Sequence, residues 1–203
     1  NTANAGAGSL RQMVLEACPG STITFAGSGI ISLSTVGDNT AGPSAMLIDK
    51  LLTIDGQSNV VKITRDTALQ PNRLRLFYIS ATGNLTLRSL TVEGFAARGG
   101  DGGDNTSTTN DAGGGGAAGL GGAIYNAGTV TIQNSTLYDN RAIGGDGGDG
   151  GRVAPNGYFA GGGGGGLGGN GGLGIDGGGG GGGTAGNGGN SPGVNGGVGG
   201  YGG

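Results

Sequence analysis

The residues of this chain that could bind a metal are aspartates set among glycines. Residues 99–104 and 144–149 both read Gly-Gly-Asp-Gly-Gly-Asp. The phrase matches the first six positions of a calcium-binding nonapeptide, and Ca²⁺ prefers oxygen ligands of this kind. If the two phrases stack, four carboxylates come together as a candidate calcium site: Asp101, Asp104, Asp146 and Asp149. Both phrases lack the large apolar residue expected two places later, so solvated turn aspartates are the alternative.

Cleavage of a polysaccharide would need paired carboxylates in a groove, or acidic calcium ligands beside a basic proton acceptor. The acids associated with predicted strands are Asp49, Asp55, Glu93 and Asp139. Three arginines could act as a base or bind an acidic sugar: Arg73, Arg75 and Arg88. Nothing in their spacing pairs these acids. The chain has no histidine, which excludes a Ser-His-Asp triad and His-ligated zinc. We therefore expect no enzymatic activity.

Charge and hydropathy exclude further partners. The 203 residues include 10 basic and 13 acidic side chains, a balance that argues against nucleic-acid binding. No apolar run approaches the roughly 18 residues of a membrane-spanning helix. The single cysteine, Cys18, permits neither an internal disulfide nor a metal cluster.

A short amphipathic helix is predicted near the start of the chain. Ser9 and Gln12 have the spacing of a capping box. Apolar residues then recur on one helical face up to Cys18, and Pro19 ends the helix. We expect this helix to cover the open end of an apolar structure, with Cys18 packed as a small core residue.

Short apolar runs separated by Gly, Asn, Asp or Pro fill the rest of residues 1–98, as in a sandwich, a barrel or a solenoid. An internal repeat distinguishes these folds, because residues 83–104 align with residues 128–149 without a gap. The apolar and threonine positions of the two segments coincide. Each unit is two strands, a corner and a glycine-rich excursion. Such units stack as the rungs of a solenoid, and parallel strands joined by crossovers coil right-handedly.

Several motifs resemble those of bacterial secreted right-handed parallel β-helix proteins, the pectate-lyase-like repeat family of surface proteins. They lie at residues 8–17, 21–25, 51–56 and 121–128, the last of which reads Gly-Gly-Ala-Ile-Tyr-Asn-Ala-Gly. The resemblance implies an all-β right-handed parallel β-helix with an N-terminal capping helix, in an extracellular or cell-surface setting. Two long glycine-rich inserts depart from the family pattern.

Residues 99–203 hold 47 of the 57 glycines. Within them, non-glycine residues recur every third position: Leu167, Asn170, Leu173 and Asp176, then Asn195, Val198 and Tyr201. Two glycines per triplet predict extended helices of the polyproline-II type, whereas collagen needs abundant proline and this chain has 5. Helices without Cβ atoms can pack and bond side by side, which offsets the ordering entropy of glycine. We expect polyglycine-II-like layers; an irregular coil is the alternative.

These predictions divide the chain into four parts: capping helix and rungs (1–98), first glycine-rich insert (99–120), a further rung (121–143) and second glycine-rich segment (144–203). Because both ends fall inside the pattern, we expect a piece of a longer product. The favoured function is a non-catalytic extracellular structural or adhesive protein, a segment or subunit of a fibre, sheath or adhesin. It would self-associate through its open rung and its glycine helices, with surface polysaccharide as a further candidate partner. No cofactor is expected, and calcium is the one candidate. A carbohydrate-binding or carbohydrate-cleaving β-helix is the alternative.

Overall fold

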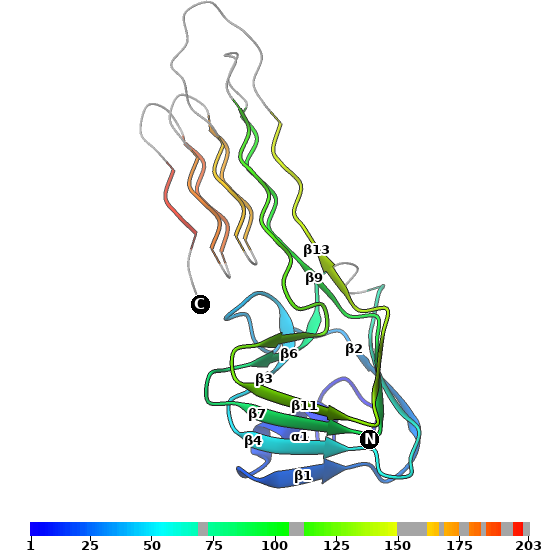
Figure 1. Ribbon diagram of the computed structural model, residues 1–203. Coiled ribbons are helices and arrows are strands. Elements are labelled where there is room, and N and C mark those ends of the chain that lie inside the picture. The colour runs from blue at the N-terminus through cyan, green and yellow to red at the C-terminus, as the bar shows by residue number, and fades with distance from the viewer. Residues whose placement is uncertain are drawn as a thin grey trace, which may run out of the picture. The chain divides into compact units, whose positions relative to one another are not determined.

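The computed structural model describes residues 1–68, 73–105, 112–149, 162–166, 169–174, 179–183, 186–191 and 197–200. The chain forms two compact units, seen in Figure 1. Unit 1 consists of Asn1–Asp38, Pro43–Ala97 and Gly121–Arg141, and unit 2 of Asn39–Gly42, Arg98–Leu120 and Ala142–Gly203. The divisions after residues 97, 120 and 141 lie within two residues of the predicted boundaries. The grouping of Asn39–Gly42 with unit 2 was not predicted.

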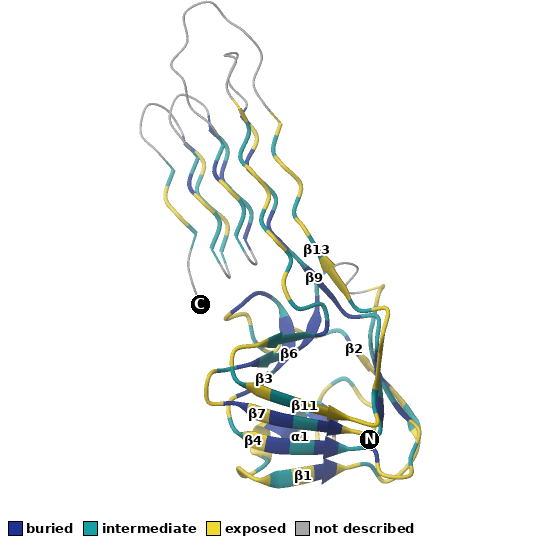
Figure 2. Cartoon of the chain, in the orientation of Figure 1, coloured by how far each residue is buried: buried dark blue, intermediate teal, exposed yellow. Residues whose placement is uncertain are grey.

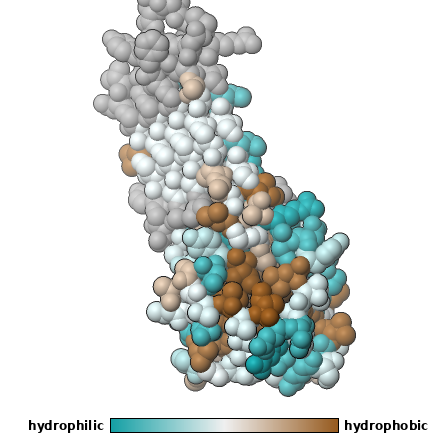
Figure 3. Space-filling model, viewed as in Figure 1, coloured by the Kyte–Doolittle hydropathy of each residue, from teal (hydrophilic) through white to brown (hydrophobic). Residues whose placement is uncertain are grey.

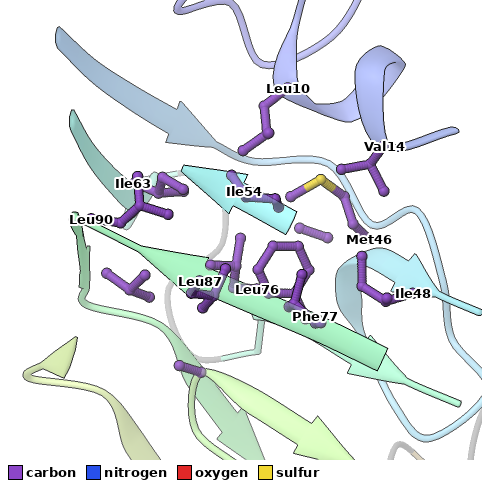
Figure 4. Close-up of a cluster of buried hydrophobic side chains, with 14 of the residues drawn as sticks. Leu10, Val14, Met46, Ile48, Ile54, Ile63, Leu76, Phe77, Leu87 and Leu90 are labelled. Atoms are coloured by element: carbon purple, nitrogen blue, oxygen red, sulfur yellow. The ribbon is translucent and has the colours of Figure 1, made fainter. Parts of the chain in front are cut away.

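Helix α1 (Leu10–Glu16) begins at Ser9, whose side chain accepts a hydrogen bond from the Gln12 amide at 3.3 Å, as predicted. Leu10 and Val14 are buried and point from α1 into an apolar cluster in Figure 4. The prediction for Cys18 is wrong, because the helix ends two residues earlier and Cys18 is exposed. A residue before proline is disfavoured in helical conformation, which explains the early end. Lys50 donates to the carbonyls of Leu15 and Ala17, both at 3.1 Å, and so caps the helix from outside.

Unit 1 is built of parallel strands that stack into sheets. In chain order they are β1 (Ser21–Thr24), β2 (Gly29–Leu33), β3 (Ser44–Ile48), β4 (Leu51–Asp55), β5 (Val61–Arg65), β6 (Arg75–Ile79), β7 (Asn84–Arg88), β8 (Leu90–Glu93), β9 (Ala96–Arg98), β10 (Ile124–Asn126), β11 (Thr129–Gln133), β12 (Thr136–Tyr138) and β13 (Arg141–Ile143). The first sheet has the order β1-β4-β7-β11, the second β2-β5-β8-β12 and the third β3-β6-β10, while β9 pairs with β13. The chain visits the three sheets in turn. We call each such passage a coil.

The predicted 45-residue register is confirmed in two of the sheets. Leu85 pairs with Val130 where β7 meets β11, and Val92 pairs with Leu137 where β8 meets β12. The corners repeat as well, since Ser89 (φ 52°) and Asn134 (φ 47°) share a left-handed backbone conformation. Sequence-equivalent residues therefore occupy equivalent places in successive coils.

The core of unit 1 lies between the sheets, and every second residue of β4 and β7 points into it. Leu52, Ile54, Leu85 and Leu87 are fully buried, and Figure 2 shows buried residues alternating with less buried ones along β4 and β7. Strands that alternate in this way bury one face in the core, against the side chains of the other sheets. The α1 side chains Leu10 and Val14 belong to the same cluster and close it at the N-terminal end.

A buried arginine ties three coils together in the third sheet. Arg75 is only 2% exposed. It donates to the Gly121 carbonyl at 2.9 Å and to the Ser44 hydroxyl at 3.1 Å, and its guanidinium lies 5.5 Å from the centre of the Tyr125 ring. Burial lowers the pKa of Arg75 from its ordinary value.

Replacing Arg75 with leucine is expected to destabilise unit 1 by about 3 kcal/mol, because the Gly121 carbonyl and the Ser44 hydroxyl both lose a charged donor. Urea unfolding followed by circular dichroism measures the change. Arg88→Leu is the matched control, since Arg88 is exposed and donates to the exposed Gln133 side chain. Equal losses in the two variants would contradict this role for Arg75.

Candidate functional site: the glycine array

Unit 2 contains a set of extended glycine-rich segments that we call the glycine array. Its described segments are 99–105, 112–120, 142–149, 162–166, 169–174, 179–183, 186–191 and 197–200. Figure 1 shows them running side by side. None of the described glycines in these segments has a left-handed φ, so where a side chain is excluded, it is excluded by packing and not by backbone conformation. Leu167, Asp176, Asn195 and Tyr201, which the period-three pattern singled out, lie outside the described residues.

Hydrogen bonds join neighbouring segments at intervals of three residues. The Gly100 amide donates to the Gly166 carbonyl at 2.7 Å, and the Gly103 amide donates to the Gly163 carbonyl at 2.8 Å. Because the numbers rise along one segment and fall along the other, the two segments are antiparallel. The same interval recurs between the other segments that follow one another in the array.

Three consecutive residues of segment 99–105 bond three different neighbours. The Gly100 amide reaches segment 162–166, the Asp101 carbonyl accepts from Gly171 at 2.8 Å, and the Gly102 amide donates to the Asp146 carbonyl at 2.7 Å. The backbone polar groups therefore point in three directions around the segment axis. This arrangement satisfies backbone groups that a lone extended helix would leave to water.

The bonds sort the segments into two layers. The first layer contains 142–149, 99–105, 169–174 and 186–191, and the second contains 112–120, 162–166, 179–183 and 197–200. Segments within the second layer are joined by Gly165 to Gly115 at 2.9 Å, Gly182 to Gly164 at 2.8 Å and Gly200 to Gly181 at 2.7 Å. The described segments alternate between the layers along the chain. Neighbours within a layer are therefore parallel, and the two layers run antiparallel to each other.

Glycine is required where neighbouring segments of a layer pack against each other. A Cβ on Gly103 would lie 2.0 Å from the Gly172 carbonyl oxygen, and one on Gly163 would lie 2.1 Å from that of Gly180. These contacts are with backbone, so no side chain can move aside. Figure 3 shows the described part of unit 2 mostly in the near-white of glycine with few coloured side chains, whereas unit 1 carries many coloured polar and apolar side chains.

Aspartate and asparagine form a row across the outer face of the first layer. The Asp146 amide donates to Asp101 Oδ1 at 2.9 Å, the Asp101 amide donates to Asn170 Oδ1 at 3.1 Å, and the Asn170 amide donates to Asn187 Oδ1 at 2.8 Å. Each side chain thus caps the amide of the next segment. This row was not predicted from the sequence, although the period-three spacing of Asn170 was a signal of it.

The four calcium candidates lie in this outer face as two adjacent pairs. Asp104 Oδ1 accepts from the Asp149 amide at 2.8 Å, which repeats the contact between Asp101 and Asp146. Arg98 bridges the latter pair, with its guanidinium 2.5 Å from Asp101 Oδ1 and 2.7 Å from Asp146 Oδ2. The hydrogen bond that Arg98 donates to Asp101, together with the nearby carboxylates, raises the pKa of Arg98.

Among the described residues, no group of three or more acidic, cysteine or histidine side chains is placed to hold a metal ion. The calcium site at the four aspartates stays a candidate from the sequence, with solvated turn aspartates as its alternative.

We expect excess Ca²⁺ to leave the thermal unfolding midpoint of the chain unchanged relative to a chelator, because Arg98 already neutralises one pair of carboxylates. Binding to the folded state would raise the midpoint by mass action. A rise that disappears in Asp104→Asn with Asp149→Asn would contradict this expectation and would support a calcium site at the second pair.

Three of the four acids considered for catalysis, Asp55, Glu93 and Asp139, contact basic side chains or backbone in unit 1. Asp55 Oδ1 accepts from the Gln57 amide in a turn, Glu93 forms an ion pair with Lys62 at 2.6 Å, and Asp139 forms one with Arg141 at 3.0 Å. These contacts pair acids with bases or backbone and bring no two of the three together.

The last coil leaves an apolar edge uncovered. Ile132 is 43% exposed and Leu137 is 41% exposed, whereas their register partners Leu87 and Val92 are fully buried. A hollow lined by Val130, Ile132 and Leu137 opens here.

Comparisons with family models, curated proteins and solved structures found no match to this chain. Within the described ranges, no helix is both long and apolar enough to cross a membrane.

Proposed function

We propose that this chain is a non-catalytic extracellular structural or adhesive protein, a segment or repeating subunit of a fibre, sheath or adhesin. In this proposal unit 1 is a right-handed parallel β-helix closed at one end by α1, and the glycine array consists of polyglycine-II helices. The order of strands in the three sheets and the 45-residue register support the first part.

The observation that carries the proposal is the hydrogen bonding of the glycine array in three directions. Ordering a backbone residue costs about 1–2 kcal/mol, and glycine loses the most freedom of all residues. Bonds between segments offset that loss wherever each segment has several neighbours, as segment 99–105 has. The glycine array exposes few side chains that could take part in catalysis, and this suits a mechanical or assembly role.

Two surfaces would mediate self-association: the uncovered edge of the last coil and the outside of the array. An exposed strand edge favours addition of another strand, and Ile132 and Leu137 supply apolar area beside it. The extracellular setting rests on the β-helix motifs, among them residues 51–56 and 121–128.

Sedimentation and a polysaccharide screen together test this function. The expected result is concentration-dependent self-association, without release of sugar fragments from acidic or neutral polysaccharides. A chain that stays monomeric and cleaves or tightly binds one polysaccharide would overturn the proposal and would favour the carbohydrate-active alternative. Glu93→Gln would then ask whether the strand acids take part.

A further inference from the structure

The two outer faces of the glycine array differ at equivalent positions. The first layer presents aspartate, asparagine and, at Leu173, leucine there. The second layer presents glycine or alanine, at Ala112, Gly115, Ala118, Gly164, Gly181 and Gly199, all of them exposed. A Cβ on Gly115 would meet nothing within 4 Å, and one on Gly181 would come no closer than 3.8 Å to another atom. At these six positions the second-layer face therefore carries no side chain larger than a methyl group.

The faces also differ in how their outward amides are satisfied. On the first layer, the side chains of Asp101 and Asn170 accept bonds from the amides of the neighbouring segments. On the second layer, no described group accepts a bond from the amides of Gly115, Gly164, Gly181 or Gly199. The carbonyls of Gly165 and Gly182 likewise receive no bond from the described residues. The outward amides of the first layer are therefore bonded by its own side chains, whereas those of the second layer are left to solvent.

We propose that the second-layer face pairs with the same face of a second copy of this chain, so that two arrays stack into a four-layered slab. The inference rests on the proposed self-association and specifies its surface. A face that carries both free amides and free carbonyls at regular intervals is self-complementary, as a twofold contact requires. It also continues the contact that the two layers already make with each other inside the array.

Charge and shape favour this occupant over the alternatives. Pairing through the first-layer faces would oppose four carboxylates of one copy to four of the other, which is unfavourable. The second-layer face carries no charged or aromatic side chain in its described part, so it offers little to orient a sugar. A glycine segment, by contrast, repeats its backbone groups at the same three-residue interval.

The test places an equal charge on either face. Gly115→Asp combined with Gly181→Asp adds two carboxylates to the second-layer face at sites with room for them. Asn187→Asp combined with Asn190→Asp adds the same charge to the first-layer face and keeps the oxygens that accept from Asn170 and Leu173. Analytical ultracentrifugation measures self-association, and hydrogen exchange verifies that both arrays remain folded.

We expect the second-layer variant to self-associate at least tenfold more weakly than the wild type. The self-association constant of the first-layer variant should differ from that of the wild type by less than threefold. Equal effects of the two variants, or none from the second-layer variant, would overturn the inference while leaving the proposed function standing. A wild-type chain that never self-associates would overturn both. If the wild-type chain binds a soluble polysaccharide and the second-layer variant does not, this face binds a glycan and not a second copy. That result would overturn the inference.

Discussion

Replacing Gly103 with alanine is expected to destabilise the glycine array by about 3 kcal/mol, the upper part of the usual range for overpacking. The added Cβ would lie 2.0 Å from the Gly172 carbonyl oxygen, so segments 99–105 and 169–174 must separate. Hydrogen exchange read by mass spectrometry reports the loss directly, through faster exchange of the Gly100 and Gly103 amides.

Gly115→Ala is the matched control for this prediction. Its Cβ would meet open space, and Gly115 has no left-handed φ. Glycine-to-alanine changes at such sites stabilise by about 0.4–1 kcal/mol, because the unfolded chain loses freedom. The two substitutions should therefore change the stability of the glycine array in opposite directions. Equal exchange rates in both variants would mean that the layers do not pack as described.

Replacing Leu87 with alanine is expected to destabilise unit 1 by about 3 kcal/mol, because the side chain is fully buried between coils and its loss leaves a cavity. Ile132 occupies the same register position one coil later but is 43% exposed. In the monomeric chain Ile132→Ala should therefore cost less than about 1 kcal/mol. Urea unfolding of both variants at low protein concentration measures the difference.

The same pair also reports on assembly. If another chain covers the edge of the last coil, the cost of Ile132→Ala should grow with protein concentration, while that of Leu87→Ala should not. Equal costs at low concentration would show that the last coil is covered within a single chain, contrary to the exposure of Ile132 and Leu137.

The register of the coils could be predicted from the sequence because it is a local property of the repeat. Residues 83–104 and 128–149 align without a gap, so Leu85 had to pair with Val130 once the strands were stacked. The capping helix was predictable for a similar reason, since Ser9 and Gln12 lie within one turn. The burial of Cys18 was predicted wrongly because its spacing matches the apolar face of the helix. Pro19 disfavours helical conformation at the residue before it, and the helix ends before Cys18.

Contacts between distant segments could not be predicted. The row of Asp101, Asn170 and Asn187 depends on which segments of the array are neighbours, and nothing local in a glycine-rich sequence specifies that. Arg75 gave no signal of burial, because its partners Ser44 and Gly121 come from two other coils. Arg98 likewise joins Asp101 and Asp146 only when their segments pack side by side.

Electron microscopy of the concentrated chain under native conditions tests whether the chain assembles as proposed. We expect regular fibres or ribbons with a constant axial repeat, built through the uncovered coil and the second-layer face. Second-layer variants such as Gly115→Asp with Gly181→Asp should give thinner or shorter assemblies. Isolated monomeric particles at every concentration would contradict a self-assembling structural protein.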